Sequence, residues 1–172
     1  LQQDFIRRPG LAPPIESLEN ALAPLLQHAR NSGVPVFHVR TEVTLAPDTR
    51  MPHWQREDLR ACVAGSDGAA TPPAFAALDG EPVFNKQFFS GFGNPGLDIE
   101  LRKRGIEELW VAGLYTHSCV RATVMDAYER GYRVTLVHDC LGSNDTLHAA
   151  IPLRYLDGRA ATVVSSAELL GG

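Results

Sequence analysis

The chain has 172 residues, 44% of them hydrophobic, which is enough for one domain over residues 1–172 with a substantial core. Its formal net charge is −4 and its basic residues are scattered, so we expect no nucleic-acid partner. No apolar run approaches the roughly 20 residues of a membrane-spanning helix and no signal peptide is recognisable, so we expect no membrane partner. Three widely spaced cysteines argue against a disulfide framework and favour a reducing, cytoplasmic location.

Hydrophobic spacing and turn residues predict helices and strands in alternation along the chain. The first predicted helix starts at Ile15, is bent by Pro24 and is closed by Gly33, and a strand over 34–39 follows it. Residues 41–80 form a long ordered excursion with a short helix near 72–78. The remaining elements are then expected in this order: a strand over 82–84, a helix over 97–104, a strand over 109–113, a helix over 120–130, a strand over 133–138, a helix from a cap at Ser143 or Asn144 to about Leu156, and a strand over 160–164.

This alternation favours an α/β fold, a three-layer sandwich in which helices cover both faces of a mainly parallel sheet. Ligands of such sheets bind at the carboxyl ends of the strands. Lys86 and Cys119 each follow the end of a predicted strand, so we expect both side chains at that edge.

Cys119 lies where a strand ending at Gly113 passes through a polar loop into a helix. The backbone N–H groups of a first helical turn favour thiolate and can hold a developing oxyanion. The pattern indicates a nucleophile, but it also fits a small buried residue, because free cysteines are commonly buried. Lys86 fits either a solvated surface residue or, because aromatic residues flank it, a desolvated cation that stabilises a thiolate.

Three segments, in order and at matching spacing, resemble the isochorismatase-like cysteine hydrolases. They are Gly113-Leu-Tyr-Thr-His-Ser-Cys-Val120, Phe84-Asn-Lys-Gln-Phe-Phe-Ser-Gly-Phe92, and the stretch from Asp126-Ala127 through Gly131-Tyr-Arg-Val134 to Asp139. The resemblance implies that the chain is a single isochorismatase-like hydrolase domain with a Rossmann-type sandwich.

The resemblance also implies particular site residues. The family uses a Cys–Lys–Asp triad, which makes Cys119 the nucleophile and Lys86 the triad lysine. A non-proline cis peptide in the family's cysteine loop matches Leu114–Tyr115. By the resemblance, this cis peptide directs the N–H of Tyr115 at a substrate oxygen that the N–H of Cys119 also contacts.

The triad aspartate is the point where the chain departs from the family pattern. The family's first strand ends in Asp-x-Gln-x-x-Phe, and here only the tail is matched, by Gln2 and Phe5. The aspartate and the first strand are therefore expected upstream of Leu1. Asp4 occupies a different position, and we interpret it as a solvated loop carboxylate.

Metal-dependent nicotinamide hydrolysis is an alternative within the family. Those enzymes carry an Asp-x-His pair after the second strand, where this chain has Arg40-Thr-Glu-Val43. Asp48 and His53 fit no ligand spacing, and His38 and His138 fit structural roles in strands. We therefore expect no metal and no other cofactor.

Five residues are weaker candidates for contact with the substrate: Phe5, Arg40, Trp54, Phe92 and His117. The aromatic residues fit a core as well as a pocket, although Trp54 lies in the excursion and is expected to cap the pocket. Arg40 follows a strand end, where it can pair with a substrate or with a surface carboxylate. His117 borders the nucleophile and fits either substrate contact or the loop surface.

The predicted activity is hydrolysis of a small amide or ureido C–N bond, other than a peptide bond, through a cysteine thioester. Cys119 attacks the carbonyl, the N–H groups of Tyr115 and Cys119 hold the oxyanion, Lys86 supplies positive charge, and the upstream aspartate transfers the proton. One alternative is isochorismatase-type cleavage of a vinyl ether, which needs no thiol. Another is a catalytically silent domain that binds a small molecule or a second subunit. The resemblance also implies a homo-oligomer, and the substrate stays unspecified.

Overall fold

The structure is a computed structural model that describes residues 1–46 and 49–171. Within these residues the strands form two parallel sheets. One sheet pairs β1 (His38–Thr41) with β2 (Val83–Lys86), and the other has the order β3 (Glu108–Leu114), β4 (Arg133–Gly142), β5 (Thr162–Val164). The predicted parallel pairing is therefore confirmed.

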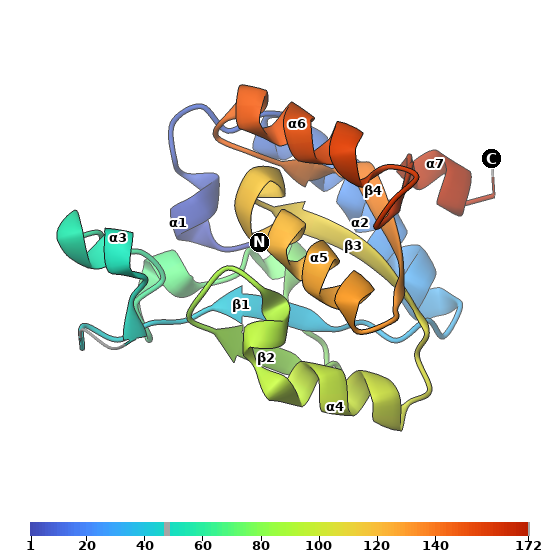
Figure 1. Cartoon of the computed structure of the whole chain (residues 1–172), viewed down its shortest axis with the longest axis horizontal. Helices are drawn as coiled ribbons and strands as arrows, with labels where there is room; N and C mark the ends of the chain where they lie inside the picture. The colour runs from blue at the N-terminus through green and yellow to red at the C-terminus, as the bar shows by residue number, and fades with distance from the viewer. Residues whose placement is uncertain (47–48, 172) are drawn as a thin grey trace.

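Helices lie on both faces of these sheets. The α-helices are α1 (Gln3–Ile6), α2 (Ile15–Asn31), α3 (Pro52–Arg56), α4 (Pro95–Lys103), α5 (Arg121–Glu129), α6 (Thr146–Leu156) and α7 (Ser166–Leu169). Single 3-10 turns lie at η2 (Asp67–Ala69), η3 (Pro73–Phe75) and η4 (Gly91–Gly93), and η5 (Thr116–Val120) is a π-helical turn. Figure 1 shows α5 in front of β3 and β4 and α2 behind them, which is the three-layer arrangement of an α/β sandwich.

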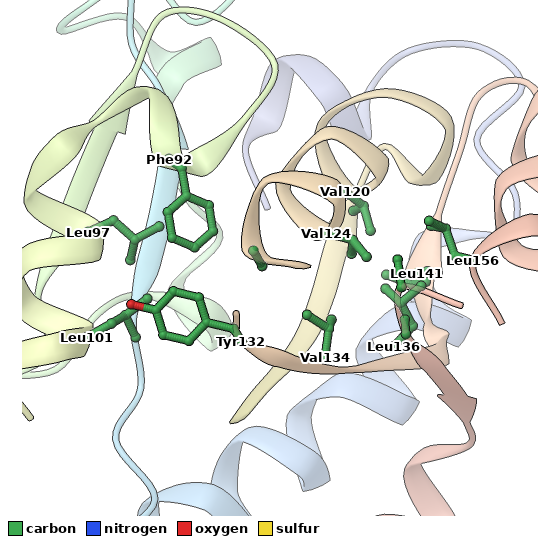
Figure 2. Packing of buried hydrophobic residues seen from close by; sticks show 13 residues of the cluster. Phe92, Leu97, Leu101, Val120, Val124, Tyr132, Val134, Leu136, Leu141 and Leu156 are labelled. Carbon is green, nitrogen blue, oxygen red and sulfur yellow. The ribbon is translucent and has the colours of Figure 1, made fainter. Parts of the chain in front are cut away.

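Strand β4 packs against the helical layers on both faces of its sheet. Val134 and Leu136 alternate along it and enter the larger core cluster, whereas Val137 and Cys140 pack with Leu25 of α2. Val137 points away from the face of Val134 and Leu136 because successive side chains of a strand alternate. Beyond Leu136 the register with β3 shifts, and Cys140 shares the cluster of Val137, so β4 supplies apolar residues to both layers. Figure 2 shows the larger cluster, in which α5 presents a helical stripe toward the sheet while α4 packs alongside through Leu97 and Leu101.

Several predicted boundaries were wrong. The strand predicted over 34–39 begins only at His38, because its partner β2 begins at Val83 and the two residues pair in register. Strand β4 continues to Gly142, so His138 lies inside the strand and not at its end. The last long helix has Asp145 as its N-cap, which accepts the His148 N–H, because the Ser143 hydroxyl is engaged with the backbone of Asp145 and with His117.

The excursion over 41–80 contains more local structure than the sequence predicts. The short helix expected near 72–78 is a single 3-10 turn, Pro73–Phe75, and helix α3 and turn η2 were not predicted. Figure 1 shows α1 and α3 on the side toward which β1 and β2 point, so the excursion covers the carboxyl edge, as expected. No helix among the described residues combines the length and apolar character that a membrane span requires.

A buried glutamine fixes the first residues of the chain to this edge. The Gln2 side chain donates to the carbonyls of Thr41 (2.8 Å) and Ala69 (3.0 Å) and accepts the Thr41 N–H (2.8 Å). The carboxylate of Asp4 accepts the N–H of Cys62 at 2.6 Å. Asp4 is thus a structural acceptor and not the solvated loop carboxylate that we expected.

An ion pair between Arg30 of α2 and Glu81, which precedes β2, makes the stability of the fold sensitive to acid. Arg30 donates two hydrogen bonds to Glu81, at 2.7 and 2.9 Å, and lowers the pKa of Glu81 from 4.5 to about 2. Because the folded-state pKa is the lower one, this contribution to the free energy of unfolding is complete above about pH 4.5 and is lost as the pH falls toward 2.

We therefore expect Glu81→Gln to lower the melting temperature at pH 7 and to flatten its fall between pH 4.5 and 2. Glu16→Gln is the matched control, because Glu16 is exposed on the same helix as Arg30. Thermal unfolding of the three proteins across this pH range is the measurement. An unchanged acid slope in Glu81→Gln would show that other carboxylates carry the acid sensitivity.

Candidate active site

Lys86 and Cys119 meet at the carboxyl edge, as their positions after strand ends predict. Lys86 is the last residue of β2 and pairs in register with Thr41, the last residue of β1. Cys119 lies in η5, directly after β3. The Nζ atom of Lys86 is 3.4 Å from the Sγ atom of Cys119. Residues 33 positions apart in the chain thus place a cation against a thiol.

The ammonium group of Lys86 is buried and fully engaged. The residue is 6% exposed, and its Nζ donates to the Phe88 carbonyl at 2.7 Å and to the Thr41 hydroxyl at 3.0 Å. An ammonium has three donors, and the sulfur of Cys119 takes the third. Of the three partners, only the sulfur can become an anion. The ammonium is therefore placed to stabilise negative charge at the sulfur or on an oxygen beside it.

The loop before Cys119 is fixed by its own side chains. The Leu114–Tyr115 peptide bond is cis, as the resemblance predicts. Tyr115 donates its hydroxyl to the Phe5 carbonyl at 2.6 Å, and burial raises the pKa of Tyr115 to about 12, so the hydroxyl keeps its proton. Thr116 donates to the Gly142 carbonyl at 3.1 Å. These bonds join the cysteine loop to α1 on one side and to the end of β4 on the other.

His117 is held beside the nucleophile in a neutral form. Its Nδ1 atom lies 2.6 Å from the Ser143 hydroxyl oxygen, and its ring stacks on Tyr115 with a centroid distance of 5.7 Å. Burial lowers the pKa of His117 below 6.5. At neutral pH the ring is therefore an uncharged hydrogen-bonding group in the cavity wall.

A cavity of about 630 Å³ opens at Cys119. Aromatic, sulfur-containing and basic side chains dominate its wall. The lining residues are Phe5, Arg8, Thr41, Met51, His53, Trp54, Phe89, Tyr115, His117, Ser118, Cys119, Arg121, Ala122, Met125 and Asn144. Phe5, Trp54 and His117 thus line the cavity, and their contact with the substrate stays a prediction.

Two of the weaker candidates lie elsewhere. Phe92 is buried in the main core and stacks on Tyr132 with a centroid distance of 5.8 Å, so the expected substrate contact is wrong for this residue. Arg40 is not among the residues that line the cavity. Its neighbour Thr41 directs its side chain at Lys86, and successive strand residues point to opposite faces, which turns Arg40 away from the site.

Several lining residues were not predicted. His53 stacks on Phe89, with ring centroids 5.8 Å apart, and brings α3 to the loop after β2. Arg8 carries no sequence signal, because it belongs to no motif. Arg121 lies two positions after Cys119, directly after the cysteine segment, and its place at the start of α5 was a usable signal. Among the described residues, no three or more His, Cys, Asp or Glu side chains gather as they would around a metal ion.

The three thiols of the chain differ in accessibility. Cys62 and Cys140 are fully buried, and burial raises the pKa of each thiol to about 12. Cys119 lines the cavity and has an ammonium at 3.4 Å. Because the thiolate is the reactive form, we expect iodoacetamide to alkylate Cys119 more than roughly tenfold faster than the other two. Peptide mapping over time measures the three rates, and equal rates would mean that Cys119 is not an activated thiol.

Comparison with known proteins gives a consistent result. The family model described as the isochorismatase domain matches residues 1–168. An isochorismatase family protein of Bacillus subtilis, YddQ, is 33% identical over 143 residues, covering 81% of this chain and 72% of that protein. Maleamate amidohydrolase of Pseudomonas putida is 30% identical over 165 residues, covering 91% of this chain and 75% of that protein. The crystal structure of an isochorismatase family protein from Desulfovibrio vulgaris superposes with a TM-score of 0.85 at 31% identity, covering 98% of this chain and 91% of that one.

Proposed function

The chain belongs to the isochorismatase family of hydrolases, and we propose that it hydrolyses a small amide or ureido C–N bond through a thioester on Cys119. The observation that carries the proposal is the contact between Lys86 Nζ, which is buried, and Cys119 Sγ, whose residue lines the cavity. A buried cation against a cysteine has a direct use in acyl transfer, where charge develops first on sulfur and then on oxygen. The similarity to maleamate amidohydrolase supports the same reaction class.

The reaction begins with attack of the Cys119 thiolate on the carbonyl carbon, which forms a C–S bond and an oxyanion. The N–H groups of Tyr115 and Cys119 donate to that oxyanion, and the Lys86 ammonium adds positive charge. Collapse of the intermediate breaks the C–N bond and releases the amine or ammonia. Water then attacks the thioester, breaks the C–S bond, and returns the free cysteine and the carboxylic acid.

The leaving nitrogen must receive a proton when the C–N bond breaks. In the family pattern the aspartate that ends the first strand makes this transfer, with the proton that the nucleophilic thiol gives up when it becomes a thiolate. No described residue that lines the cavity is a carboxylate that replaces it. Asp4, the nearest carboxylate in the sequence, is occupied by the N–H of Cys62.

Cleavage of a vinyl ether, the second activity class of this family pattern, makes no use of a thiol. The engagement of Cys119 with Lys86 favours C–N hydrolysis over it. The test is a panel that contains maleamate, a small ureido acid, nicotinamide and isochorismate, assayed with the wild-type protein. We expect turnover of a C–N substrate. Turnover of isochorismate alone would overturn the proposal.

A further inference from the structure

The charged side chains on the cavity wall have a single sign. Arg8 and Arg121 line it, and no Asp or Glu among the described residues does so. Both come from segments next to the reactive centre. Arg121 is the first residue of α5, two positions after the nucleophile, and Arg8 follows α1, whose Phe5 carbonyl accepts the Tyr115 hydroxyl.

Neither of these two guanidinium groups has a partner within the described part of the chain, since no salt bridge or hydrogen bond of its side chain is present there. Three other arginines, in contrast, are paired with acids. Arg7, adjacent to Arg8, pairs with Asp67, Arg30 pairs with Glu81, and Arg104 pairs with Glu100. These three arginines are thus neutralised by acids, whereas the two guanidinium groups without a partner among the described residues line the same cavity as Cys119.

A guanidinium presents a planar set of donors that matches a carboxylate, and its hydrogen bonds to an anion are stronger than those between neutral groups. Basic side chains in a recess with apolar walls also concentrate anions there, because the low-dielectric wall focuses the field. Here Phe5, Trp54 and Phe89 provide that apolar wall.

We propose that the substrate is an anionic amide, with the scissile C–N bond at Cys119 and a carboxylate elsewhere in the molecule that Arg8 and Arg121 bind. The inference rests on the proposed function of this site. It assigns Arg8 and Arg121 as specificity-determining residues. The enzyme should therefore prefer half-amides and ureido acids, which carry a carboxylate, over neutral amides.

A matched pair of compounds tests the charge requirement. Maleamate and maleamide carry the same scissile amide and nearly the same shape, and they differ in one carboxylate. We expect the wild-type kcat/KM to favour maleamate by about ten- to a hundredfold, the range of one or more hydrogen bonds to a charged group. Arg8→Gln and Arg121→Gln should each reduce that preference at least about threefold through loss of maleamate turnover, while maleamide turnover changes less than about twofold.

Arg154→Gln is the control, because it removes one exposed positive charge from α6, away from the cavity. The control should keep the full preference for maleamate. Equal wild-type turnover of the two compounds would overturn the anionic-substrate inference and leave the proposed C–N hydrolysis intact. Equal loss of the preference in the control would also overturn it, since the effect would then belong to the overall charge.

Binding separates this inference from the reaction. Calorimetric titration of Cys119→Ala with maleamate and with maleamide measures the charge preference without chemistry. Tighter binding of maleamate, reduced by Arg8→Gln or Arg121→Gln, supports the inference even if the wild-type protein hydrolyses neither compound. Binding of neither compound, or equal binding of both, counts against it.

Discussion

Replacing Cys119 with alanine is expected to abolish C–N hydrolysis, with a loss in kcat of roughly 10⁴-fold or more, the range seen when a nucleophile is removed from a coupled set of catalytic groups. The physical reason is that the thioester cannot form without the sulfur. Because alanine fills less of the wall than cysteine and leaves the rest of the cavity in place, the variant should still bind substrate. Steady-state turnover and a binding titration on the same sample measure the two properties.

Cys62→Ala is not a suitable control, because Cys62 is fully buried and its loss would disturb the packing around it. Cys119→Ser is the better companion variant, since it keeps the shape and replaces the sulfur with a poorly ionised hydroxyl. Both variants should be inactive and equally stable. Amide hydrolysis that persists in Cys119→Ala would rule out the covalent route, and persistence of isochorismate cleavage alone would indicate a vinyl-ether hydrolase.

Replacing Lys86 with methionine should reduce kcat by roughly 10²- to 10³-fold, the usual effect of removing one group that stabilises the developing charge. Methionine keeps most of the length and the apolar stem of lysine but removes the ammonium that lies 3.4 Å from Cys119 Sγ. The rate at which iodoacetamide alkylates Cys119 should fall as well, because the thiolate loses its adjacent cation.

The chain offers a direct control for this variant, since Lys103 is its other lysine and is exposed near the end of α4. Lys103→Met should leave turnover and the alkylation rate unchanged. Thermal unfolding checks that Lys86→Met is folded, because Thr41 and the Phe88 carbonyl lose a hydrogen-bond donor. Full activity in a folded Lys86→Met protein would remove lysine from the proposed mechanism.

The meeting of Lys86 with Cys119 could be predicted from the sequence, because the ends of two predicted strands determine where these residues lie. Lys86 ends the parallel strand β2 and Cys119 lies in the turn after the parallel strand β3. The two strands belong to different sheets, but both direct their carboxyl ends to the same side of the fold, where ligands of α/β proteins bind. The helix that begins at Ile15 follows from hydrophobic spacing and turn residues, the parallel pairing follows from the alternation of helices and strands, and the structure confirms both. The meeting of Lys86 with Cys119 is confirmed as geometry, whereas the catalytic roles of both residues stay proposals.

The wall of the cavity could not be predicted in the same way, because long-range hydrogen bonds shape it. The excursion has no hydrophobic period, and it is held by Gln2, which bonds to Thr41 and Ala69, and by Asp4, which bonds to Cys62 at a positive φ of 54°. Such bonds leave no local pattern in the sequence. Phe92 shows the opposite error, since its place in the lysine segment suggested a pocket but the turn η4 buries it in the core.

The thioester on Cys119 is the central claim, and rapid acid quench during turnover tests it most directly. Wild-type protein mixed with an amide that it hydrolyses is quenched within a few turnovers, digested, and analysed by mass spectrometry, with hydroxylamine added to a parallel sample. We predict that the Cys119 peptide gains the mass of the acyl group and that hydroxylamine diverts product from the acid to the hydroxamate. Continued turnover with an unmodified Cys119 peptide and no hydroxamate would contradict the proposed mechanism.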